Sequence, residues 1–410
     1  MTDRALAPAP VTATPTRLPA PIASLTLLAS IVVSLLAASS APTPLYAIYQ
    51  AEWGFTPITT TVVFGVYALA VLAALLTLGR LSDHLGRRPV LLTAMAVQVV
   101  AMVIFATAAG VPELLAARVV QGLSTGAALG AIGAGMLDVD RARGATANAV
   151  APGMGTATGA LMSGLLVRYL PAPTHLVYVA LVGVFAVQAA GVLLMPETAP
   201  RRPGALATLR PEIRLPGHVR PAMRLAAPVL FAVWALAGLY GSLGPALVRV
   251  SSGSSSVVLG GLSLFVLAGT AAVSILLLRG LAARMVMLIG VTTLIAGVAV
   301  TLAAVDASSP GWFFAGTAVA GVGFGSGFQG GIRIVIPTVA AGERAGVLSL
   351  VFVVSYLGMG VPAVVAGVLV VHGGGLLVTA REYGIAVIVL AAVALPGLLR
   401  HGTARTAARA

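Results

Sequence analysis

Few residues in this chain could do covalent chemistry. The 410 residues include no cysteine and only five histidines, which are scattered along the sequence. No Ser/His/Asp set, carboxylate pair or metal-ligand spacing occurs, so the sequence predicts neither an enzyme nor a metal site. One short stretch between two apolar runs carries Asp83 together with Arg87 and Arg88. The chemistry available there is electrostatic, since a carboxylate pairs with arginines or with the N-terminus of a helix.

These charges lie in the short stretch Gly79–Pro89, between the apolar runs Ile58–Leu78 and Val90–Ala109. Each run has about 20 residues, enough to cross a bilayer, so the stretch predicts a hairpin between two membrane helices. It resembles the loop between helices 2 and 3 of the major facilitator superfamily, G-x-L-x-D-x-x-G-R-R/K. The fixed positions of that pattern are filled here by Gly79, Leu81, Asp83, Gly86, Arg87 and Arg88.

The resemblance implies a role for the loop as a conformational gate. In the family it locks the two halves together at the cytoplasmic side, and its aspartate approaches the start of helix 11. In this sequence that start lies near Arg344-Ala345-Gly346. The alternative is that the arginines only anchor the topology and that Asp83 is a solvated turn residue.

Composition places the chain in a membrane. Hydrophobic residues make up 59% of it and charged residues only 9%, against about 25% charged in soluble proteins. The pI is near 11.3 and the net charge is +13. All 24 basic residues are arginines. They are spread over the loops and the two tails, apart from two within spans, so no compact basic face for nucleic acid is predicted.

Twelve apolar runs predict an all-α integral membrane protein with two six-helix halves. The predicted spans are Ile22–Ser40, Ile58–Leu78, Val90–Ala109, Leu114–Leu137, Ala145–Val167, His175–Met195, Leu225–Val248, Val257–Leu278, Val286–Ala304, Trp312–Pro337, Gly346–Val371 and Val378–Leu399. The predicted division is a disordered cytoplasmic tail at 1–20, an N-terminal half at 21–195, a cytoplasmic linker at 196–224, a C-terminal half at 225–399 and a cytoplasmic tail at 400–410.

Arginine bias and internal repetition support this division. Of the 24 basic residues, 19 fall on the side of the termini, 3 on the opposite side and 2 within spans, which predicts that both termini are cytoplasmic. Gly122–Gly126 parallels Gly321–Gly325, and Gly164–Val167 parallels Gly367–Val370, both at an offset of about 200 residues. Two repeated halves are typical of secondary transporters.

Arg118 lies inside a predicted span, where an arginine is costly and marks a functional-site candidate. With Gln121 and Gly122 it resembles the helix 4 motif of the family, R-x-x-Q-G-x-x-x-G/A. We therefore expect coupling residues among Arg118, Gln121, Gly122 and nearby Glu113. The alternative is that Arg118 reaches the interface by snorkelling past Pro112.

Gly155, Gly159 and Gly164 have the spacing that lets membrane helices pack closely. They also resemble the helix 5 motif of drug–proton antiporters, G-x-x-x-G-P-x-x-G-G, with Ala160 in place of the proline and Ser163 in place of a glycine.

Polar and amphipathic side chains within the spans could line a mostly apolar cavity, although such groups also serve as glue between helices. The candidates are Tyr67, Gln98, Asn148, Trp234, Tyr240, Gln329 and Tyr356. No acidic residue is expected at mid-depth in a span, so protonation would use acids near the span edges, namely Glu52, Asp83, Glu113 or Asp306.

These patterns predict a multi-pass transporter of the cell membrane that works by alternating access. It is most like the drug–proton antiporters. We expect proton-coupled efflux of a small amphipathic molecule, with the proton gradient as energy source and no cofactor, and a monomer in membrane lipid. The alternatives are uptake or efflux of a neutral metabolite such as a sugar, or a non-transporting membrane sensor on the same scaffold.

Overall fold

The computed structural model describes residues 21–399, so the predicted tails at 1–20 and 400–410 lie outside the described residues. Within this range the regular elements are helices and no strand occurs. The N-terminal half contains α1 (Pro21–Ser40), α2 (Pro42–Trp53), α3 (Pro57–Leu78), α4 (Ser82–Leu85), α5 (Arg87–Ala106), α6 (Val111–Val139), α7 (Arg141–Tyr169) and α8 (Pro173–Leu194). The rest contains η1 (Ala205–Leu209), η2 (Gly217–Val219), α9 (Arg220–Ser242), α10 (Gly244–Ser252), α11 (Val257–Leu277), α12 (Ala283–Asp306), α13 (Pro310–Val335), η3 (Ile336–Thr338), η4 (Ala341–Glu343), α14 (Arg344–His372) and α15 (Gly375–Ala392).

Twelve helical stretches of the described chain are long and apolar enough to cross a membrane, as the sequence predicts. The largest difference is the first span. It was expected to end at Ser40 but continues as α2 to Trp53. Pro42 and Pro44 interrupt the hydrogen-bond ladder of this span without ending it, because other helices bond to the carbonyls near the break, as described below.

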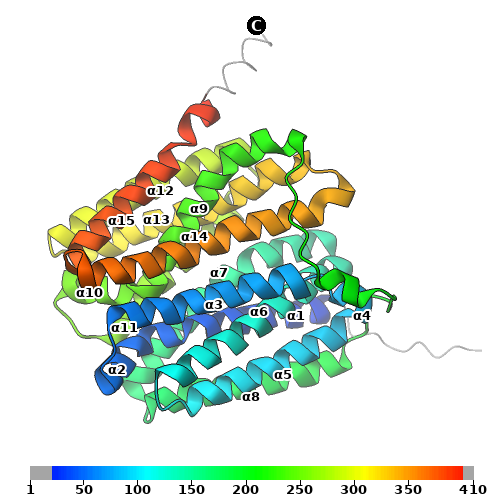
Figure 1. The fold of residues 1–410 in the computed structure, drawn as a ribbon, viewed down its shortest axis with the longest axis horizontal. Coiled ribbons are helices and arrows are strands. Elements are labelled where there is room, and N and C mark those ends of the chain that lie inside the picture. Colours follow the sequence, from blue (N-terminus) through cyan, green and yellow to red (C-terminus); the bar gives the residue numbers. More distant parts are fainter. Residues whose placement is uncertain (1–20, 400–410) are drawn as a thin grey trace, which may run out of the picture.

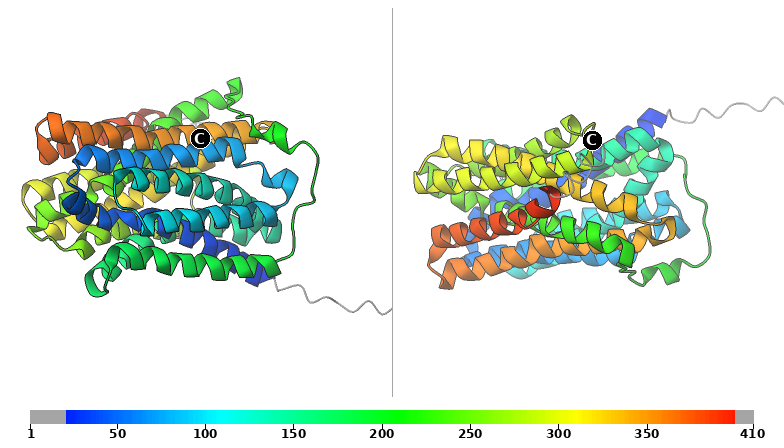
Figure 2. Two further views of the ribbon diagram at one scale, coloured as in Figure 1. Left: turned by 60° about the horizontal axis from the view of Figure 1, so that its bottom comes forward. Right: turned by 90° about the horizontal axis from the view of Figure 1, so that it is seen from above.

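The two halves lie side by side, with α1 to α8 in one and α9 to α15 mostly in the other (Figure 1). Residues 195–219 form the connector between them, and Figures 1 and 2 show it crossing one end of the bundle beside α4. We call this the connector end. The tips of α2 and α10 lie at the opposite end.

The halves meet along two pairs of helices, α3 with α14 and α7 with α11. Small residues bring the backbones close together. A Cβ added to Gly65 of α3 would lie 2.8 Å from Val364 of α14, and one added to Gly164 of α7 would lie 3.3 Å from Val257 of α11. Both of these contacts lie toward the opposite end. There, Thr43 of α2 also donates a hydrogen bond to the carbonyl of Gly241 in α9, at 3.3 Å.

The first and seventh spans break in the same way. α1 passes into α2 at Pro42, and α9 passes into α10 just before Pro245. Proline has no N–H to continue the helical ladder, so each break leaves backbone carbonyls that need other donors. The breaks lie at corresponding places in the two halves, in keeping with the internal repeat.

Candidate functional site

Arg118 is fully buried in α6, with 0% of its surface exposed. Its Nε–H donates to the hydroxyl oxygen of Tyr46 at 3.1 Å. One terminal nitrogen donates to the carbonyl of Ser39 at 2.9 Å and to the side-chain oxygen of Gln121 at 2.8 Å. The other also donates to Tyr46. The guanidinium therefore joins α6 to α1 and α2 and is enclosed by protein.

Three aromatic rings surround the same guanidinium. Its central carbon lies 5.7 Å from the ring centre of Tyr46, 5.2 Å from that of Tyr67 and 5.6 Å from that of Phe105. Rings at this distance attract a cation through their negative faces. Between residues 21 and 399 no carboxylate forms an ion pair with Arg118, and Glu113 is exposed. The charge is held by dipoles and rings alone.

Arg118 and Gln121 of α6 donate to backbone carbonyls next to the break in the first span. Pro42 cannot donate to the carbonyl of Ala38, and the side-chain nitrogen of Gln121 donates to this carbonyl at 3.0 Å instead. Ser163 of α7 donates to the carbonyl of Ala41 at 2.6 Å. Side chains from α6 and α7 thus satisfy the backbone at the break, which membrane burial requires.

Three of the predicted cavity residues come together where the halves meet. Trp234 of α9 packs on Tyr356 of α14 with ring centres 5.2 Å apart, and Tyr67 of α3 belongs to the same apolar cluster. Phe324 and Phe328 of α13 meet Trp234 edge-on at 5.9 and 5.6 Å. The indole N–H of Trp234 is buried and has no hydrogen-bond partner among the described residues. We call these five residues the aromatic cluster.

The other four predicted cavity residues lie elsewhere and contact neighbouring helices. Asn148 donates to the carbonyl of Gly133 at 2.9 Å, and Gln329 donates to that of Ile275 at 3.3 Å. Tyr240 pairs with the hydroxyl of Thr317 at 2.8 Å inside the C-terminal half. Gln98 is fully buried in α5, and neither of its amide atoms has a partner in the part of the chain described.

The charged loop forms a compact network at the connector end. Arg87 contacts Asp83 and also donates to Ser82 at 2.8 Å and to Asp138 of α6 at 3.2 Å. Gly86 has φ +94° and a Cβ there would lie 2.7 Å from Glu197, so both the backbone and the space favour glycine.

Glu197 of the connector completes this network and is not among the residues predicted from the sequence. Its two carboxylate oxygens accept from the backbone N–H groups of Arg87 and Arg88, at 2.8 and 3.0 Å. These are the first N–H groups of α5, where a carboxylate is stabilised by unpaired donors and by the helix dipole. The acid lies about 110 residues from its partners, so spacing alone could not reveal the contact.

The start of α14 meets the connector rather than Asp83. The backbone N–H of Arg214 donates to the carbonyl of Gly346 at 3.3 Å. Glu212, two residues earlier, pairs with Arg80 of the loop at 2.9 Å. Throughout the described chain Asp83 makes no hydrogen bond or ion pair to α14. The expected approach of Asp83 to this helix is therefore absent from the present conformation.

Residues 27–285 match the sequence profile of the Major Facilitator Superfamily, which is more than half of the chain. The chain belongs to this superfamily. Its fold agrees, because a crystal structure of the nucleoside transporter NupG superposes with a TM-score of 0.67 over 91% of this chain and 98% of NupG, at 14% identity. That likeness concerns the fold. Membership points to a transporter rather than an enzyme.

Relatives in other organisms match over a short segment. An uncharacterized transporter of Rickettsia felis is 40% identical over 81 residues, which is 19% of both chains. Another from Rickettsia bellii is 39% identical over 74 residues, or 18% of both. The chain thus spans about a fifth of the length of the curated relatives it matches.

The glycines predicted at helix contacts do lie where helices approach closely. A Cβ on Gly122 would lie 2.5 Å from Ala70 of α3. Gly155 and Gly159 lie directly against the backbone of α1, at Val33 and Ala37. Gly164 faces α11 across the two halves. The predicted packing glycines therefore face two different partners.

Acidic groups are sparse in the membrane-spanning part. Asp306, at the end of α12, pairs with Arg381 of α15 at 2.7 Å. Glu52 and Glu113 are exposed near span ends. Glu382 lies inside α15 and is not among the candidate acids predicted from the sequence. No group of three metal-ligating side chains occurs among the residues described.

Proposed function

We propose that the chain is a secondary transporter that exports a small amphipathic molecule across the cytoplasmic membrane by alternating access. The observation that carries this proposal is the aromatic cluster at the meeting of the two halves of a major facilitator fold. Substrate sites of such transporters lie near the membrane midplane, at the interface between the repeats. The cluster draws residues from both halves, so rocking of the halves would open and close it.

The side chains of the cluster favour a flat, partly apolar substrate. Aromatic rings stack on flat ligands and bury large apolar areas. The free indole N–H of Trp234 would donate to an acceptor on the ligand, and leaving such a group unpaired costs about 1–3 kcal/mol. The guanidinium of Arg118 lies against Tyr67 of the cluster, with its central carbon 5.2 Å from the ring centre. We propose that the substrate is uncharged or anionic, because a cation would meet this positive charge with no carboxylate beside it.

We further propose that the proton gradient drives export, through the motif that contains Arg118. A guanidinium stays protonated, so it would act by lowering the proton affinity of an acid brought near it, which includes an acidic substrate. The arginine bias supports cytoplasmic termini and a cytoplasmic connector end. With contacts such as Thr43 to Gly241 at the opposite end, the present conformation would be closed toward the outside. The protein would work as a monomer in membrane lipid.

A second candidate is uptake or efflux of a neutral metabolite such as a sugar. The observation that favours it is Ala160, which stands where the helix 5 motif of the drug antiporters has proline. Under this alternative, Trp234 would stack on the apolar face of a sugar ring or similar group. A compound panel containing both classes separates the two proposals.

The experiment is a flux assay in vesicles containing the purified protein and a panel of labelled compounds. The Trp234→Leu variant removes the central ring and is expected to lower flux of the transported compound at least tenfold. The Trp312→Leu variant is the matched control, because Trp312 is 66% exposed at the start of α13. Equal flux in wild type and Trp234→Leu would rule out the cluster as the substrate site. Saturable transport of sugars and not of aromatic amphiphiles would establish the alternative.

A further inference from the structure

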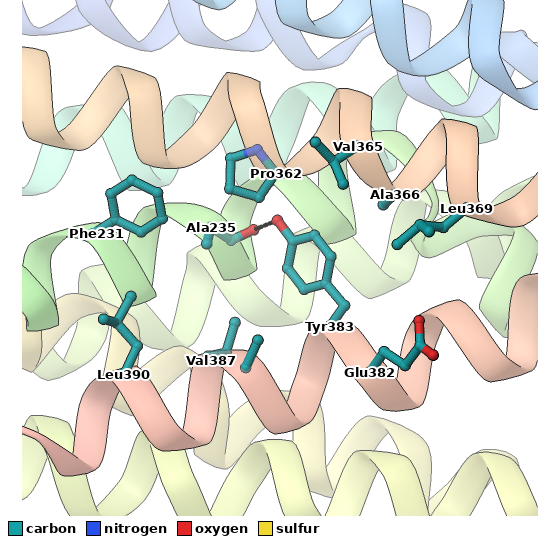
Figure 3. A pocket seen from close by; sticks show the side chains of 11 residues that line it. Phe231, Ala235, Pro362, Val365, Ala366, Leu369, Glu382, Tyr383, Val387 and Leu390 are labelled. Carbon is teal, nitrogen blue, oxygen red and sulfur yellow. Dashed lines mark hydrogen bonds between the residues drawn. The ribbon is translucent and has the colours of Figure 1, made fainter. Parts of the chain in front are cut away.

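A separate cavity of about 230 Å³ lies between α9, α14 and α15, within the C-terminal half. Figure 3 shows Phe231 and Ala235 of α9 on one side, Pro362 and Ala366 of α14 above, and α15 below. This volume is well above the ~10–15 Å³ that one water-sized group needs, so the cavity has room for several such groups in a row. That is part of one acyl chain.

Small residues create this hollow. Ala235, Ala366 and Ala386 face it from three different helices, and none has a side chain long enough to fill it. Tyr383 crosses the cavity and donates its hydroxyl to the carbonyl of Ala235 at 2.7 Å (Figure 3). The hydroxyl is therefore already satisfied, and the remaining lining is apolar apart from Glu382.

The cavity opens on the membrane-facing surface of the bundle. Val365, which lines it, is 50% exposed, and Ile385 and Val389 of α15 are 57% and 58% exposed. All three lie in helices that are apolar and long enough to span a bilayer. Exposed apolar side chains in such a helix face acyl chains, so the occupant comes from the bilayer and not from water.

One end of the cavity carries an unpaired negative charge. Glu382 lies seven residues from Gly375, where α15 begins, or about 10 Å along the helix axis. Over residues 21–399 its carboxylate makes no hydrogen bond or ion pair. The neighbouring Arg381 is bound by Asp306. This end therefore has a net charge of −1 and attracts a cation, and an unpaired acid within a span is by default a functional-site candidate.

We propose that this cavity binds an aminophospholipid. One acyl chain would lie between α14 and α15, and the ammonium of the headgroup would pair with the Glu382 carboxylate. The position of Glu382 near the opposite end of the bundle matches the level of lipid headgroups, while Phe231 and Leu390 lie deeper, where acyl chains are. The site is distinct from the aromatic cluster, and lipid binding there does not depend on the transport proposed above.

The test is native mass spectrometry of the detergent-purified protein, titrated with phosphatidylethanolamine or with phosphatidylglycerol of the same acyl chains. Wild type is expected to bind phosphatidylethanolamine more tightly. Glu382→Gln keeps the shape and removes the charge, so it should weaken this binding by about two- to fivefold, the range of exposed ion pairs. It should leave phosphatidylglycerol binding unchanged or stronger.

Filling the cavity tests the position of the acyl chain. Ala386→Phe is expected to remove tight binding of both lipids, whereas Val389→Phe, on the exposed face outside the cavity, should not. Melting temperatures identify any variant that fails to fold, and Ala366→Leu on the facing wall then provides the same test. Equal binding of the two lipids by wild type, or phosphatidylethanolamine binding unaffected by Glu382→Gln and by a folded cavity-filling variant, would overturn the proposal.

Discussion

Replacing Arg118 by alanine would remove the donors that join α6 to the broken first span. Three acceptors would lose their partner, namely the Tyr46 hydroxyl, the Ser39 carbonyl and the Gln121 side-chain oxygen. Polar contacts between membrane helices contribute about 0.6 kcal/mol on average and up to ~1.7 kcal/mol. Two of the three contacts, to Tyr46 and Ser39, join different helices, so they give an expected loss of about 1 to 3 kcal/mol in the free energy of unfolding. The cost of placing a charge in the membrane also applies to the separated helices, so it does not offset this loss.

The assay is the unfolding midpoint of the purified protein in mixed micelles with increasing denaturing detergent, alongside its melting temperature. Arg118→Lys should fall between wild type and alanine, because an ammonium keeps the charge and loses the planar fork that reaches several acceptors. Arg143→Ala is the matched control. Arg143 is exposed and its pair with Asp140 is 3.8 Å long, so its loss should change stability by less than about 1 kcal/mol.

One result would refute this reasoning. If Arg118→Ala unfolds at the same midpoint as wild type and Arg143→Ala, the buried network does not hold α6 to the first span. A variant of unchanged stability that loses transport only under a pH gradient would instead establish a direct coupling role for Arg118.

Three further predictions concern the gate, the packing and the topology. Asp83→Asn should lower transport at least fivefold with normal membrane insertion, because the carboxylate balances charges in the loop and is available to α14 in other conformations. Wild-type flux in this variant would mean that the loop serves only as a topology anchor. Gly159→Val should prevent stable folding, since its Cβ would collide with the α1 backbone, whereas Gly183→Val on an open helix face should fold, as thermal melting will show. Reporter fusions after Arg224 and at the C-terminus should report a cytoplasmic location, and a fusion at Asp306 should report an external one. A C-terminal reporter located outside the cell would contradict the orientation predicted from the arginine bias.

The number and order of the spans follow from sequence because hydrophobic length is a local property. The end of the first span does not, because Pro42 and Pro44 normally stop a helix. Here the span continues to Trp53, and Gln121 and Ser163, far along the chain, donate to carbonyls at the break. Continuation of a broken helix is decided by tertiary contacts that spacing does not encode.

The sequence predicts some residues of the candidate site but not the tertiary contacts that they make. An arginine within an apolar span is rare, so Arg118 could be predicted as a site residue. Its partners on the first span could not be predicted. A polar side chain in a span can face a neighbouring helix or the interface between the halves. The sequence alone does not show which of the two it faces. Tyr67, Trp234 and Tyr356 gather at that interface, while Asn148 and Gln329 bond to adjacent helices.

Acids close to the predicted end of a span are difficult to assign to the membrane or to the loop, and Glu382 is an example. The predicted twelfth span, Val378–Leu399, contains Glu382 four residues from its start, but this acid is absent from the predicted candidates. In the structure α15 begins at Gly375 and the acid lies inside the helix. The three extra residues place Glu382 about two turns from the start of the helix.

The central claim is tested most directly by measuring transport in proteoliposomes with and without an imposed pH gradient. Purified protein is reconstituted, and uptake of labelled aromatic amphiphiles into the vesicles is followed with the interior acidic, with no gradient, and after addition of a protonophore. The account predicts accumulation above equilibrium only with the gradient, its loss on adding the protonophore, and its loss in Trp234→Leu. Uptake that equals that of protein-free vesicles for every compound under every gradient would contradict it.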